Sequence, residues 1–185
     1  MIRNHMGLSL AGLCLALGAC AVPPPYSPMG ERTTQARVRV KVQNYHAYPA
    51  LISVKAIDDI EPKEQILAIF NKGWMGMGAT PKTPELIGMP ETKAEANMPV
   101  LERYITGNRE LRLTLQATLD GIYICGDGGA FTPAPGHDYE LVVPIQTTSM
   151  GGNGQCRLFL YEIVPAGNSY DRRPVTLTAL PSAKK

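Results

Sequence analysis

The sequence predicts an all-β domain, folded as a single antiparallel β-sandwich that carries a long insertion and one disulfide. Three observations predict it. Short segments in which apolar and polar residues alternate recur along the chain, each bounded by Pro, Gly or Asn. A stretch rich in Gly, Pro and Met interrupts them over residues 73–100. Two cysteines, Cys125 and Cys156, stand at the edges of predicted strands.

The clearest strand signals are strict alternations. Over residues 37–43 valines alternate with Arg37, Arg39 and Lys41, so we expect the valines to face the core and the basic side chains to face water. Residues 110–119 alternate in the same way. The other predicted strands cover residues 51–57, 122–125, 139–146, 157–164 and 175–178, with a glycine-rich loop at 126–129. Strands of this length and spacing are typical of immunoglobulin-like or transthyretin-like sandwiches.

Two stretches do not follow this pattern. Residues 58–73 fit either a helix or a loop that leads into a buried strand, and periodicity alone does not choose between them. The insertion at 73–100 carries Trp74, Met75 and Met77 among glycines and prolines that prevent regular strand pairing. Long irregular insertions in compact domains are often functional, so these three residues are the candidate contacts for a partner protein. The alternative for the methionines is Cu(I) binding, or simple packing in the core.

The N-terminal residues carry the most specific motif. Arg3 precedes an apolar run over residues 7–19, which is shorter than the roughly 20 residues that a membrane-spanning helix needs. The run ends in Leu17-Gly18-Ala19-Cys20, which resembles the lipobox of bacterial lipoproteins. The resemblance implies that residues 1–19 are a signal peptide and that Cys20 is lipidated, with palmitate among its acyl chains. Ala21 favours the outer membrane, facing the periplasm, over retention in the inner membrane.

The remaining chain divides simply. Residues 20–35 contain four prolines and predict an extended tether that could hold the domain up to ~45 Å from the lipid. The sandwich domain is expected over residues 36–180, followed by a short tail at 181–185.

The cysteines and the charges limit the chemistry. Cys14 leaves with the signal peptide and Cys20 takes the lipid, so Cys125 and Cys156 remain in an oxidising compartment where they are expected to form a disulfide. The alternatives are a redox pair or two metal ligands. Without Arg3, the chain has 17 Lys and Arg against 16 Asp and Glu, a balance that does not suggest binding to nucleic acid, for which a strongly basic face would be expected.

Candidate catalytic residues are few. His137 is followed by Asp138, but neighbouring strand residues point to opposite faces, and Asp127 lacks the spaced acids of a calcium loop. The chain contains no GxSxG, HExxH or P-loop motif. We therefore expect no catalytic residue, metal or cofactor, and a lipoprotein that binds another envelope protein or steadies an envelope assembly. The alternative is a periplasmic hydrolase or metal-binding lipoprotein, which convergence of His46, His137, Asp127 and Asp138 would favour.

Overall fold

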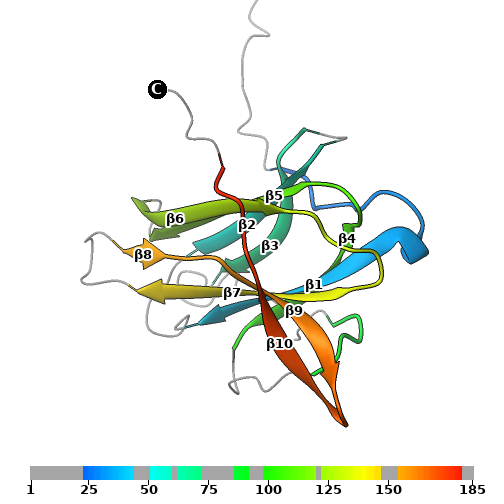
Figure 1. Ribbon diagram of the computed structural model, residues 1–185. Coiled ribbons are helices and arrows are strands. Elements are labelled where there is room, and N and C mark those ends of the chain that lie inside the picture. Colours follow the sequence, from blue (N-terminus) through cyan, green and yellow to red (C-terminus); the bar gives the residue numbers. More distant parts are fainter. Residues whose placement is uncertain are drawn as a thin grey trace, which may run out of the picture.

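The part of the chain that the structure describes is all-β and forms two sheets that face each other (Figure 1). The structure is a computed structural model that describes residues 23–43, 51–59, 62–71, 86–91, 98–119, 122–146 and 154–180. Within these ranges no helix has the length and hydropathy that crossing a bilayer requires. Several predictions fall outside the described residues: the signal peptide at 1–19, Cys20, His46, Trp74, Met75, Met77 and the tail at 181–185.

The first sheet has four strands in the order β3-β2-β5-β6, and every neighbouring pair is antiparallel. Its strands are β2 (Leu51–Asp58), β3 (Gln65–Asn71), β5 (Leu111–Leu119) and β6 (Ile122–Phe131). The chain thus forms a strand where residues 58–73 left helix and strand open. The helix alternative was wrong, because β3 pairs with β2 along its length and buries Leu67, Ala68 and Phe70.

The second sheet has six strands in the order β10-β9-β7-β1-β4, with β8 paired to β7. Its strands are β1 (Gln35–Gln43), β4 (Val100–Thr106), β7 (Asp138–Gln146), β8 (Gln155–Cys156), β9 (Phe159–Ala166) and β10 (Ser169–Val175). One pair departs from the antiparallel prediction, since β1 and β7 run parallel. Strands β2 to β6 lie between them in the sequence, so no tight turn connects them and forces an antiparallel pair.

The core lies between the two sheets. The valines of β1 and Leu111, Leu113 and Leu115 of β5 are almost completely buried there, as their alternation predicts. The predicted disulfide between Cys125 and Cys156 is confirmed. It joins β6 of the first sheet to β8 of the second, so it holds the two layers together.

The predicted glycine-rich loop at 126–129 was wrong, because these residues continue strand β6. The C-terminal residues pass over the strand at this point, and Ala130 and Thr178 exchange two backbone hydrogen bonds of 2.8 Å. A Cβ atom on Gly129 would lie 2.7 Å from the Cβ atom of Leu177, which is closer than carbon atoms approach. The glycines therefore make room for the C-terminal segment rather than form a turn.

The N-terminal segment lies against the domain. Residues 23–34 run along the start of β3 and the end of β4, and include a short 3₁₀ helix, η1 (Arg32–Thr34). Most of the predicted tether at 20–35 is therefore docked, because its backbone and Tyr26 find partners on both sheets.

Candidate functional site

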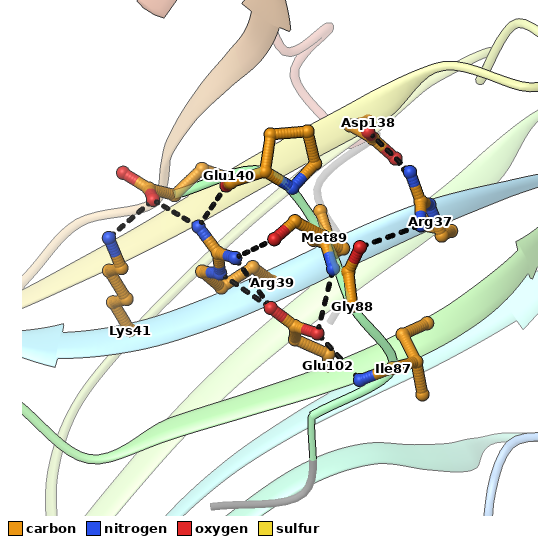
Figure 2. A network of polar contacts seen from close by, with 10 residues as sticks. Arg37, Arg39, Lys41, Ile87, Gly88, Met89, Glu102, Asp138 and Glu140 are labelled. Atoms are coloured by element: carbon orange, nitrogen blue, oxygen red, sulfur yellow. Dashed lines mark hydrogen bonds and ion pairs between the residues drawn. The ribbon is translucent and has the colours of Figure 1, made fainter. Parts of the chain in front are cut away.

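The candidate site lies on the outer face of the six-stranded sheet, where β1 presents Arg37, Arg39 and Lys41 away from the core (Figure 2). We expected these basic side chains to face water. That expectation was wrong for two of them, since Arg39 is 5% exposed and Lys41 is 3% exposed. Buried cations need compensating acids, and both neighbouring strands supply them.

Strand register brings the acids to Arg39. Glu102 on β4 and Glu140 on β7 are its direct cross-strand partners, so three neighbouring strands carry a row of alternating charge. The guanidinium donates two hydrogen bonds to Oε1 of Glu102, at 2.8 Å from Nε and 2.6 Å from Nη2. Its Nη1 lies 3.8 Å from Oε2 of Glu140. Cross-strand pairing of opposite charges therefore fixes the guanidinium in the sheet.

Glu140 is the centre of a second set of ion pairs. Its carboxylate is fully buried and lies 2.5 Å from Nζ of Lys41 and 2.9 Å from Nη1 of Arg172. Burial lowers the pKa of Lys41, although the neighbouring Glu140 carboxylate opposes the shift. Glu140 thus lies near three cations, Arg39, Lys41 and Arg172, and Arg39 also pairs with Glu102.

An irregular segment at residues 86–91, which we call the strap, crosses this charged row (Figure 2). Glu102 binds it through Oε2, which accepts hydrogen bonds from the backbone N–H of Ile87 at 2.7 Å and of Met89 at 3.3 Å. One carboxylate therefore uses one oxygen for Arg39 and the other for the strap.

The arginines bind the carbonyl groups of the strap. Arg39 donates to the carbonyl oxygens of Met89 at 3.1 Å and Pro90 at 2.9 Å, and Arg37 donates to that of Gly88 at 3.2 Å. The Met89 side chain is buried as well. The strap belongs to the predicted insertion at 73–100, so charged side chains of the sheet hold part of that insertion in place.

A smaller polar cluster lies beside the row. Arg37 forms a bidentate pair with Asp138, at 2.6 and 2.7 Å, and this hydrogen bonding raises the pKa of the arginine. Glu162 accepts hydrogen bonds from Arg173 and from Nδ1 of His137. Burial alone would raise the pKa of Glu162, but these two partners outweigh it and hold the pKa below its ordinary value.

The acids and the histidine singled out in the sequence have separate partners. Asp138 pairs with Arg37 and His137 with Glu162, while Asp127 accepts the backbone N–H of Leu158 at 2.8 Å. Among the described residues, no three His, Cys, Asp or Glu side chains are grouped as a metal site would need. Asp127 instead joins β6 to the segment that follows the disulfide.

Sequence reasoning missed the members of the charged row. Glu102 and Glu140 each look like an ordinary polar position of an alternating strand, and only strand register places them opposite Arg39. One signal could have indicated them: β1 carries three regularly spaced cations on one face, and two other strands carry isolated acids that could neutralise them.

An open pocket of about 490 Å³ lies away from the strap, among Asp127, Phe159, Tyr161, Pro174 and Leu177. Phe159 is exposed beside it.

No protein-family model matches the chain, and no curated protein is similar enough to count as a relative.

Proposed function

We propose that the protein is a lipoprotein of the bacterial cell envelope, anchored through Cys20 in the outer membrane and facing the periplasm. Its domain binds another envelope protein, or steadies an envelope assembly, through the insertion at 73–100 with Trp74, Met75 and Met77 as contacts. The resemblance of residues 17–20 to a lipobox supports the anchor. The strap supports the binding role.

We also propose that the two sheets form a single sandwich of immunoglobulin-like or transthyretin-like type. The support is that one continuous core contains residues of both sheets and that the disulfide bridges them. Such scaffolds commonly present binding segments on a rigid frame.

The observation that carries the binding proposal is the way the strap is held. Burying Arg39, Glu102 and Glu140 costs desolvation free energy that a purely apolar cover over the sheet would avoid. In return the strap receives directional hydrogen bonds at Ile87, Gly88, Met89 and Pro90. These hydrogen bonds fix the position of an irregular segment. A binding surface needs such a defined position, whereas apolar packing alone would be enough to cover the sheet.

The described residues give no comparable support to the hydrolase or metal-binding alternative. His137 and Asp138 point to different partners, Glu162 and Arg37, and Asp127 bonds to a backbone amide. A nucleophile and base in hydrogen-bonding reach would be the minimum observation for that alternative.

Labelled palmitate tests the anchor. Wild-type protein expressed in bacteria should incorporate the label and fractionate with membranes, and Cys20→Ala should lose both properties. Cys14→Ala is the matched control, because it removes a cysteine six residues away inside the signal peptide and should leave labelling unchanged. Equal labelling of the wild type and Cys20→Ala would overturn the proposal.

A further inference from the structure

The segment that leads from Cys20 into the domain is docked almost from its start. The carbonyl oxygen of Pro24 accepts a hydrogen bond of 2.7 Å from the backbone N–H of Ile66, and the N–H of Tyr26 donates one of 2.8 Å to the carbonyl oxygen of Ile66. Pro25 and Ile66 thus form a parallel bridge at the edge of β3. The N-terminal segment adds a short extended stretch to the first sheet.

Tyr26 secures the segment to the second sheet as well. Its side chain is 7% exposed and belongs to the core. Its hydroxyl lies 3.0 Å from Oγ1 of Thr106 and accepts the Thr106 backbone N–H at 3.2 Å. The N–H of Met29 then donates to the same Oγ1 at 3.1 Å. A buried aromatic ring and several hydrogen bonds therefore hold residues 24–29 on both sheets.

This docking limits how far the domain can move from a lipid on Cys20. Pro24 is the fourth residue after Cys20, and each residue spans at most about 3.6 Å, so the Pro24 Cα atom stays within ~14 Å of the Cys20 Cα atom. A free tether over residues 20–35 would reach about three times farther.

The docking also selects one end of the molecule. Ile66 lies at the start of β3, Thr106 ends β4, and β1 begins nearby at Gln35, so all three mark one end of the two sheets. The insertion leaves β3 at Asn71 and rejoins β4 at Val100, both at the opposite end. The nine residues of β1 separate the ends by ~30 Å.

We propose that the lipid surface faces the end of the sheets where β3 begins and β4 ends, which is also the end that carries the loops at 107–110 and 132–137. The end from which the insertion leaves then faces away from the membrane, so its protein partner approaches from the aqueous side. This inference rests on the proposed lipid at Cys20.

The short link, and not attraction to anionic lipid, sets this orientation. Two exposed arginines at the membrane-facing end are paired with acids, Arg109 with Asp59 at 3.6 Å and Arg112 with Glu110 at 2.8 Å. The other exposed cations described there, Arg32 and Lys63, each adjoin an exposed acid in the chain, Glu31 and Glu64, so basic side chains do not outnumber acidic ones at this end. Since a polybasic patch is what draws proteins to anionic lipid, the orientation should not depend on lipid charge or on salt.

Energy transfer from tryptophan to lipid tests the orientation. Residues 20–185 are prepared with Trp74→Phe, so that Arg109→Trp or Gln146→Trp supplies the single donor, near the proposed membrane end or at the opposite end. With Cys125 and Cys156 bonded, Cys20 is the one free thiol and couples to a maleimide lipid in phosphatidylcholine vesicles that contain dansyl-labelled lipid.

We expect severalfold more transfer from position 109 than from position 146, unchanged when anionic lipid is added. Flexible Gly-Ser residues inserted between Val22 and Pro23, or Tyr26→Ala, should reduce the difference, whereas Tyr26→Phe keeps the ring packing and should retain most of it. Equal transfer at the two positions, or more from position 146, would overturn the orientation. Because the lipid is attached chemically, this result is independent of palmitate labelling in cells, which tests the anchor itself.

Discussion

Glu102→Gln tests whether the charged row holds the strap. The substitution keeps the shape of the side chain but removes the negative charge that compensates the buried guanidinium of Arg39, which donates two hydrogen bonds to Glu102. Both carboxylate oxygens of Glu102 accept hydrogen bonds, and the substitution replaces one of them by an amide N–H₂ group, which is a donor. That group then faces either the guanidinium of Arg39 or the backbone N–H groups of Ile87 and Met89, all of which are donors as well. No rotation of the glutamine amide satisfies both sides.

The magnitude follows from burial. Breaking a buried ion pair by removing one partner costs about 3–5 kcal/mol, because the remaining charge stays buried without compensation. Arg39 keeps only the more distant Glu140, at 3.8 Å, and the carbonyl oxygens of the strap. At roughly 2–4 °C per kcal/mol for a chain of this size, the melting temperature should fall by about 6–20 °C.

Thermal unfolding followed by circular dichroism measures this effect, with Glu110→Gln as the control. Glu110 pairs with Arg112 at 2.8 Å, but both side chains are about half exposed, and such pairs contribute about 0–1 kcal/mol. Trypsin adds a local readout, since Lys82 and Lys93 flank the strap and should be cleaved faster in Glu102→Gln below the unfolding temperature. Equal melting temperatures for the two variants, with unchanged cleavage, would refute the role assigned to Glu102.

Two further predictions concern the disulfide and the stability of the fold at acidic pH. Replacing Cys125 and Cys156 together by alanine should lower the free energy of unfolding by about 3–4 kcal/mol, given a sequence separation of 31 residues, and denaturant titration would contradict this if the two midpoints agreed. The pKa of Glu162 lies below its ordinary value of 4.5 in the folded protein, so its ionised form stabilises the fold above that pH, and this contribution is lost as the pH falls through the folded-state pKa. Glu162→Gln should therefore flatten the acid limb of stability against pH, and an identical acid limb in both proteins would count against it.

Local pattern was sufficient for the strands in which apolar and polar residues alternate strictly. Residues 37–43 and 110–119 predicted β1 and β5, because strict alternation specifies which side chains are buried. The same pattern failed on the outer face of β1. It identifies a polar side, but whether that side meets water or a row of acids depends on which strands lie next to it.

Other differences also have their cause in distant contacts. Strand β4 was not predicted, because Glu102, Arg103 and Tyr104 interrupt the alternation, and the strand is needed chiefly as the partner of β1. The glycines of β6 looked like a loop because their small size serves contact with the C-terminal segment, at Leu177 and Leu180. Prolines at 23–25 predicted extended backbone, but not that the extended segment would pair with β3.

Crosslinking in intact cells tests the proposed function most directly. A photoreactive phenylalanine analogue replaces Trp74 in one protein and Arg109 in another, both otherwise full length. We expect position 74 to form one discrete adduct with an envelope protein, position 109 to form none with that protein, and Glu102→Gln to reduce the adduct by releasing the strap. No adduct at position 74, or the same adducts from both positions, would contradict a partner bound through the insertion.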